Sequence, residues 1–182
     1  MLFAPDTEAA LLAAAHLVNT GLRRDGVDAL AGVADLDAFY ADFGYAGRHD
    51  RDDVEVQRVR QVRARLHGLW SAGRDEAAAL VNDMLREARA LPYLTRHDEW
   101  DWHLHATELD APLPVRIGVE AAMAFVDVIR SDEWGRLAIC AAPDCSAVLI
   151  DLSRNRSRRF CDVNNCANRT HVAAYRARRA AT

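Results

Sequence analysis

Four cysteines constrain this chain more than any other feature, because all of them fall in one short segment near its end. They form two pairs, Cys140 with Cys145 and Cys161 with Cys166, with four residues inside each pair and fifteen between the pairs. Zn(II) prefers four ligands at the corners of a tetrahedron, and each close pair of thiolates can supply one edge of it. We therefore predict that these four cysteines bind one structural Zn(II) ion.

Disulfides, redox chemistry and four unrelated buried thiols are the alternatives to a metal site. No cysteine occurs outside the segment from Cys140 to Cys166, which is a poor distribution for cross-linking a secreted domain. Such a cluster favours metal binding in a reducing compartment. Four thiolates also fill the coordination sphere and leave no position for water or a substrate, so we expect the zinc to be structural rather than catalytic.

The charge is distributed unevenly along the chain. The formal net charge is -4, but residues 151–182 carry eight arginines against two acidic residues, which makes this tail +6 and the remainder -10. A small basic module joined to an acidic body indicates that the basic end meets a polyanion. DNA is the partner that this distribution predicts.

The first 139 residues have the pattern of a mainly helical domain with one hairpin. Apolar residues at helical spacing predict five helices and a short helical turn. They are expected over 7–19 with Asp6 as the cap, after Asp35 up to 44, over 52–73, 75–90 and 115–130, and around Trp134. An alternating pattern over 100–106 predicts a strand paired with 91–95, in which Trp100, Trp102 and Leu104 face the core and Asp101, His103 and His105 face solvent.

Around the cysteines we expect a turn, a hairpin and a helix, which is the treble-clef arrangement. Residues 148–151 and 158–161 are the expected strands, joined by the polar turn 153–157, and the helix is expected from Asn168 with Cys166 at its entrance. The predicted fold class is therefore mainly α. It comprises a multihelical N-terminal domain with a β-hairpin over 1–135 and a small C-terminal treble-clef-like zinc finger over 136–182.

The C-terminal segment resembles a known family. Cys166-Ala167-Asn168-Arg169, preceded by Asp151-Leu152-Ser153-Arg154-Asn155 and Ser157-Arg158-Arg159-Phe160-Cys161, is similar to the CGNR zinc finger of bacterial proteins with an ABATE domain. His16-Leu17-Val18-Asn19-Thr20 resembles the early Asn-Thr signature of that domain. Proteins of the family are described as stress-related transcription regulators, so the resemblance implies DNA binding. The sequence departs from the family at Ala167, where the motif has Gly, which matters if that position needs a positive φ or a close backbone approach.

We predict that the arginines of the tail contact DNA phosphates. They are Arg154, Arg156, Arg158, Arg159, Arg169, Arg176, Arg178 and Arg179. One alternative is a solvated basic face, and another is a zinc-stabilised protein-interaction or dimerisation module without nucleic acid binding. Asn168 as a helix cap and Arg169 bound to hairpin carbonyls or to Asp151 would be structural roles instead. Tyr175, three residues after Val172, is expected to pack against the finger.

An enzyme is the weakest hypothesis. A cluster of His97, His103 and His105 with Asp98, Glu99 and Asp101 would be its candidate site, but no phosphate-binding glycine loop, nucleophile elbow or zinc-protease helix accompanies it. We therefore expect no catalytic residues.

The remaining expectations concern the location of the protein and its effector. The sequence contains no apolar run of membrane-spanning length and no leader-like start, so we expect a cytoplasmic protein without a membrane partner. Phe39, Tyr40, Tyr93, Trp100 and Trp102 are candidates to line a pocket for a small-molecule effector, although an ordinary core is the simpler explanation. A homodimer is compatible with the sequence.

Overall fold

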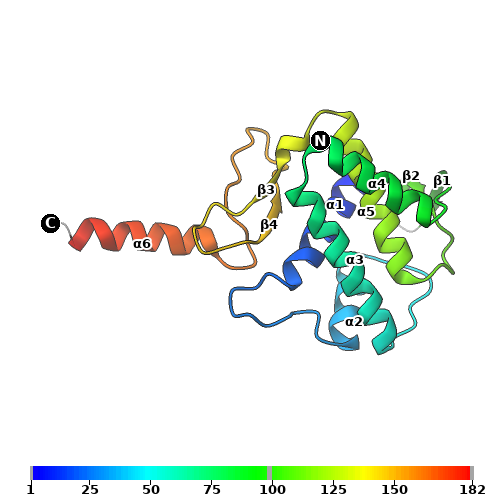
Figure 1. Ribbon diagram of the computed structural model, residues 1–182, viewed down its shortest axis with the longest axis horizontal. Coiled ribbons are helices and arrows are strands. Elements are labelled where there is room, and N and C mark those ends of the chain that lie inside the picture. The colour runs from blue at the N-terminus through cyan, green and yellow to red at the C-terminus, as the bar shows by residue number, and fades with distance from the viewer. Residues whose placement is uncertain (1, 98–99, 181–182) are drawn as a thin grey trace.

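The computed structural model describes residues 2–97 and 100–180, apart from the side chains at 97 and 100. The helices are α1 (Pro5–Thr20), α2 (Val33–Asp42), α3 (Asp53–Ser71), α4 (Arg74–Glu87), α5 (Leu113–Arg130) and α6 (Cys166–Ala180), with a 3-10 turn at Trp134–Arg136. The strands are β1 (Tyr93–His97), β2 (Trp100–His105), β3 (Leu137–Ile139) and β4 (Val148–Ile150). The predicted fold class is thereby confirmed, and Figure 1 shows a helical body beside β3 and β4, with α6 projecting from their side of the molecule.

The ends of the first helices follow from local chemistry. Helix α1 begins at Pro5, because proline has no N–H to leave unpaired in a first turn, and it ends before Gly21. Asp6 lies inside the first turn, so the expectation that it caps α1 is wrong. Asp52 does cap α3, since its carboxylate accepts the N–H of Glu55 at 2.7 Å.

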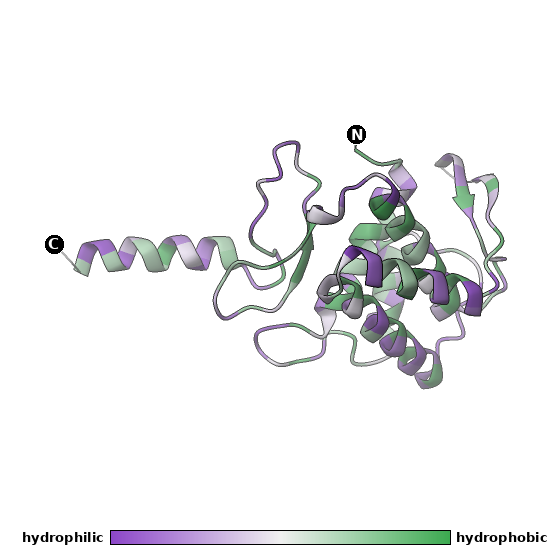
Figure 2. Ribbon diagram, turned by 45° about the horizontal axis from the view of Figure 1, so that its top comes forward, coloured by the Kyte–Doolittle hydropathy of each residue, from purple (hydrophilic) through white to green (hydrophobic). Residues whose placement is uncertain are grey.

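The core of the body surrounds α5, which packs against α1, α3 and α4. Helix α5 is the most thoroughly buried helix of the body, and Ile117, Ala122 and Phe125 are fully enclosed. Trp70 of α3 meets Phe125 edge to face, with ring centroids 5.2 Å apart. In Figure 2 the apolar faces of these helices point inward. No helix among the described residues combines the length and the apolar composition that crossing a membrane requires.

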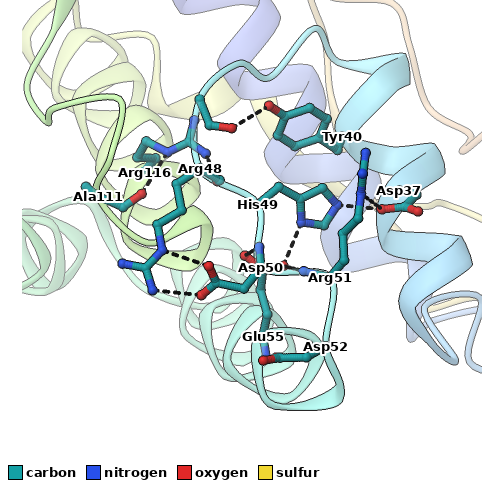
Figure 3. A network of polar contacts seen from close by, with 11 residues as sticks. Asp37, Tyr40, Arg48, His49, Asp50, Arg51, Asp52, Glu55, Ala111 and Arg116 are labelled. Atoms are coloured by element: carbon teal, nitrogen blue, oxygen red, sulfur yellow. Dashed lines mark hydrogen bonds and ion pairs between the residues drawn. The ribbon is translucent and has the colours of Figure 1, made fainter.

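A buried carboxylate holds the loop between α2 and α3 (Figure 3). Glu55 is 3% exposed and accepts the backbone N–H groups of Asp50 and Arg51 at 3.1 and 3.0 Å. The Nδ1 atom of His49 lies 2.6 Å from the same carboxylate, and its Nε2 atom lies 2.6 Å from Asp37. One side chain thus fixes three consecutive residues of the loop.

We expect Glu55→Ala to lower the free energy of unfolding by about 3 kcal/mol, because it removes the buried carboxylate that accepts from two backbone N–H groups and contacts His49. Urea unfolding followed by circular dichroism measures this change. Glu87→Ala is the control, since Glu87 is 62% exposed in its ion pair with Arg65 and should contribute less than about 0.5 kcal/mol. Equal effects of the two substitutions would contradict the role given to Glu55.

The hairpin β1–β2 forms as predicted, but its two faces are the reverse of the prediction. Trp102 and Leu104 are 64% and 44% exposed, whereas His103 is 9% exposed and faces the body. The inner face borders a cavity whose lining is mostly apolar but includes Asp6, Asp127 and Arg116, which give His103 polar surroundings. The guanidinium of Arg96 covers the outer Trp102 ring at 5.5 Å from its centroid.

The second hairpin also differs from the prediction. Strands β3 and β4 pair antiparallel and enclose the first cysteine pair, whereas the predicted strand over 158–161 is not formed. The outer edge of β4 is taken by Asn19, whose side chain bonds both backbone groups of Val148 at 2.9 Å. The N–H of Arg158 donates instead to the carboxylate of Asp151, at 2.8 Å. Four of the predicted arginines therefore lie on an irregular loop rather than on a hairpin.

Candidate metal centre and nucleic-acid interface

The four predicted ligands come together. The Sγ atoms of Cys140, Cys145, Cys161 and Cys166 all lie within 4.8 Å of one another. The Cys145–Cys161 and Cys161–Cys166 sulfur pairs are each 3.6 Å apart. Zinc–thiolate bonds of about 2.3 Å in a tetrahedron place sulfurs about 3.8 Å apart, so the cluster has the dimensions of one zinc site. The predicted single structural Zn(II) ion is confirmed to this extent.

Backbone geometry brings each cysteine to the cluster. Cys140 directly follows β3, and its N–H donates to the carbonyl of Ala147 at 2.8 Å, which closes the loop that carries Cys145. Asn165 has a φ of +48°, a conformation that asparagine tolerates better than most residues, and Cys166 then opens α6. The partial positive charge at the start of a helix favours a thiolate there.

Polar side chains around the cluster donate to its sulfur atoms. The amide of Asn164 contacts Sγ of Cys145 at 3.3 Å, and the guanidinium of Arg169 contacts Sγ of Cys166 at 3.5 Å. Donors of this kind orient metal ligands and stabilise their negative charge. Neither residue was predicted to support the metal site. For Arg169, the sequence did offer a signal, because a residue three positions after Cys166 in a helix lies on the same face as that cysteine.

The thiols differ in acidity. Burial opposes ionisation of Cys145, but hydrogen bonds from the Ala147 N–H and the Asn164 amide outweigh it and lower the pKa of this thiol to about 7. Burial raises the pKa of Cys166 to about 11, and it raises the pKa of Cys161 still further. Zinc binding must therefore displace protons from these buried thiols, so the affinity for zinc falls as the pH falls.

The structure shows that Ala167, which replaces the glycine of the family motif, fits its position in the backbone. Ala167 lies in the first turn of α6, is exposed, and does not have a positive φ. Alanine favours helix over glycine by about 1 kcal/mol, so this position does not require glycine. Asn168 also lies inside the helix, which excludes the suggested capping role. Arg169 pairs with Asp144 at 2.7 Å rather than with Asp151 or with hairpin carbonyls.

The finger and the body share one core. Val148 and Ile150 of β4 are buried in the main hydrophobic cluster, and the indole N–H of Trp70 donates to the carbonyl of Leu149 at 3.1 Å. Asn19, from the Asn-Thr pair noted in the sequence, adds its two bonds to Val148. The finger is therefore built onto the body rather than tethered to it.

We expect Asn19→Ala to lower the free energy of unfolding by about 2 to 4 kcal/mol, because both backbone groups of the buried Val148 lose their partner. Guanidinium unfolding monitored by tryptophan fluorescence measures this. Asn82→Ala serves as the control, because Asn82 is exposed on α4. A variant as stable as the parent protein would show that Asn19 does not join the two parts.

The predicted DNA-binding arginines differ in the partners that they have within the protein. Arg156 pairs with Glu133 at 2.7 Å, Arg158 with Asp162, and Arg169 with Asp144. Among the described residues, the exposed side chains of Arg154, Arg159 and Arg176 form no ion pair or hydrogen bond. Arg178 is exposed, and Arg179 lies over the Tyr175 ring at 5.9 Å. That these eight residues contact DNA stays a prediction.

Helix α6 stands apart from the rest of the molecule in both overall views (Figures 1 and 2). Within it, only Cys166 is buried. Val172 is 39% and Tyr175 is 54% exposed, so the expectation that Tyr175 packs against the finger is wrong. The zinc finger is too small to cover the whole length of α6. The helix is therefore accessible to a partner on all sides beyond its first turn.

The candidate effector and catalytic residues are only partly brought together. A cavity of about 640 Å³ lies between the hairpin and the body, and His103, His105 and Trp102 line it. Phe39 and Tyr40 pack in or against the main core instead. Of the other candidates, Tyr93 does not line the cavity and Asp101 is exposed. The described part of the structure does not include Asp98, Glu99 or the side chains of His97 and Trp100.

The comparisons with known proteins agree with this architecture. The CGNR zinc finger matches residues 136–179. The ABATE family, whose description reads "Putative stress-induced transcription regulator", matches residues 12–132. A search of curated proteins found no match. Because the ABATE match covers more than half of the sequence, the chain belongs to the ABATE family, and it carries a CGNR zinc finger after the ABATE domain.

Proposed function

We propose that this protein is a transcription regulator that binds DNA through its zinc finger, with α6 as the element that enters the groove. The projection of α6, lined with arginines, is the observation that carries the proposal. In this proposal the protein binds DNA without catalysing a reaction, and we expect it to act in the cytoplasm. The body would then be the part that regulates binding.

The dimensions and charge of α6 support this role. A helix of 15 residues is about 22 Å long, and the major groove of B-DNA is wide enough to admit one. Arg176, Arg178 and Arg179 lie toward the free end of α6, Arg169 lies in its first turn, and Arg154 and Arg159 lie on the loop that precedes Cys161. Arginines at both ends of a projecting helix can contact phosphates on either side of a groove.

Selection of bound duplexes from a random DNA pool tests the proposal and identifies any preferred sequence. We expect recovery of DNA by the zinc-loaded protein, and loss of recovery when a chelator is present. Recovery that does not differ from beads without protein, with zinc content verified, would contradict the proposal. Equal recovery with and without zinc would show that the finger is not the binding element.

Dimerisation through α6 is the second candidate, because Val172 and Tyr175 expose apolar surface three residues apart on one helix face. Native mass spectrometry separates the two functions. A monomer that shifts DNA supports the first candidate. A dimer that Tyr175→Glu dissociates, without any DNA binding by the parent protein, supports the second.

A further inference from the structure

The cavity between the β1–β2 hairpin and the helices has the size of a small-molecule site. Its volume is about 640 Å³, and α1, α5 and the hairpin all contribute to its lining. In Figure 2 the hairpin stands beside the helical body. Protein interiors are close-packed and contain few voids larger than a water molecule, whereas ligand pockets commonly have this volume. We propose that the cavity binds a small organic amine, a mainly apolar molecule that carries one protonated amino group.

Short side chains on α1 keep the cavity open. Ala9, Ala10 and Ala13 line it from this helix, and their methyl groups are too short to fill the space up to the hairpin. Leu94 lines the cavity from the hairpin, and Met123 lines it from α5. Most of the surface that a ligand would meet is therefore apolar, which favours a hydrocarbon body for the ligand.

Two carboxylates lie in this apolar lining. Thr7 of α1 is buried, and its hydroxyl donates to the carboxylate of Asp127 on α5 at 2.6 Å. Asp6, the neighbour of Thr7 in the chain, lines the same cavity. Both carboxylates are partly buried, and neither forms an ion pair with a described residue. Solvent screens a partly buried charge less than an exposed one, so these carboxylates favour a cationic group on the ligand.

The position of Asp127 in its helix strengthens this preference. Asp127 lies in the last turn of α5, which ends at Arg130. The carbonyl groups at the end of a helix carry a partial negative charge, so an acidic side chain is unfavourable there. A bound ammonium group offsets the negative charge of both the carboxylate and the helix end.

The basic side chains of the lining do not reverse the preference. Arg116 is 3% exposed, and its guanidinium donates to the backbone carbonyls of Ala46, Arg48 and Ala111. These three bonds leave little of the guanidinium available to a ligand. Arg130 is exposed, so its charge is screened by solvent.

Calorimetric titration of the zinc-loaded full chain tests the site with three probes that share one apolar skeleton. They are 4-phenylbutylamine, 4-phenylbutanol and 4-phenylbutyrate, which at neutral pH are a cation, a neutral molecule and an anion. We expect one amine to bind per chain, about tenfold more tightly than either of the others, because only the amine pairs with the carboxylates. No binding of the amine to the folded protein would overturn the proposal, and so would equal or tighter binding of the alcohol or the butyrate.

Replacing Asp127 with asparagine assigns the amine to the carboxylates. Asp127→Asn keeps an oxygen that can accept from Thr7 but removes the charge, so the affinity for the amine should fall to that for the alcohol. Asp83→Asn, the same change at an acidic residue of α4 that is 60% exposed and does not line the cavity, should leave the affinity unaltered. Amine binding that is unchanged in folded Asp127→Asn would contradict the proposal.

Filling the cavity gives a second test that does not depend on charge. Ala9→Phe should weaken binding of the amine by placing a ring in the cavity, whereas Ala79→Phe, at an exposed position of α4, should not. Circular dichroism confirms that each variant is folded. Full amine binding by folded Ala9→Phe would place the amine elsewhere and overturn the proposal. The site lies in the body, so these measurements do not depend on whether the finger binds DNA.

Discussion

Replacing Cys161 with serine should abolish stoichiometric zinc binding and unfold the finger together with part of the body. Cys161 is nearly buried at the centre of the cluster, and its Sγ atom lies 3.6 Å from those of both Cys145 and Cys166. Structural zinc contributes about 10 to 16 kcal/mol of binding free energy, which is more than the whole stability of most domains. Elemental analysis and thermal unfolding measure the two effects.

The consequence for the body distinguishes this account from one in which the finger is an independent module. Because β4 completes the main core and bonds to Asn19 and Trp70, loss of zinc should lower the melting temperature of the helical domain as well. The fluorescence of Trp70 should report the change. Ser157→Ala, in the same segment but outside the metal site, is the control. A Cys161→Ser protein whose body melts like the parent protein would refute the shared core.

Replacing Arg154, Arg159 and Arg176 together with alanine should weaken DNA binding on the order of a hundredfold near 0.1 M salt. These exposed side chains have no acidic partner among the described residues, so each is available to a phosphate. Each lost phosphate contact removes about 0.9 from the slope of log affinity against log salt, which predicts a slope smaller by about 2.7. Fluorescence anisotropy across a salt series measures both quantities.

Two comparisons make this test specific. Arg65→Ala with Arg86→Ala removes two exposed arginines from the body and should leave the slope unchanged. Arg156→Ala with Arg158→Ala should have a smaller effect than the triple variant, because these arginines are already paired with Glu133 and Asp162. If the body variant weakens binding as strongly as the triple variant, the interaction depends on overall charge and not on the finger.

The metal site was predictable because the spacing of its four cysteine ligands is visible in the sequence. Two cysteine pairs close together, with no other cysteine in the chain, leave few arrangements open. The helices were predictable for a similar reason, since apolar residues recur with helical period along α3, α4 and α5. The ends of helices depend on backbone details, and so Pro5 rather than Thr7 begins α1, with Ala4 instead of Asp6 at the cap position.

The errors arose where the local sequence fits two arrangements equally well and tertiary contacts decide between them. Alternation along β2 gives the period of a strand, but it cannot tell which face meets the body, and in the fold His103 is buried whereas Trp102 is exposed. The second hairpin was misplaced because Asn19, more than a hundred residues away, occupies the edge of β4. The pairing of Arg156 with Glu133 likewise depends on the fold and not on the local sequence.

The most direct test of the central claim is titration of a labelled DNA duplex with the zinc-loaded full chain in dilute salt, followed by chelation and restoration of zinc. The account predicts saturable binding that weakens as salt increases, disappears when zinc is removed, and returns when zinc is added back. No change in anisotropy at any protein concentration, with one zinc ion per chain verified, would contradict it.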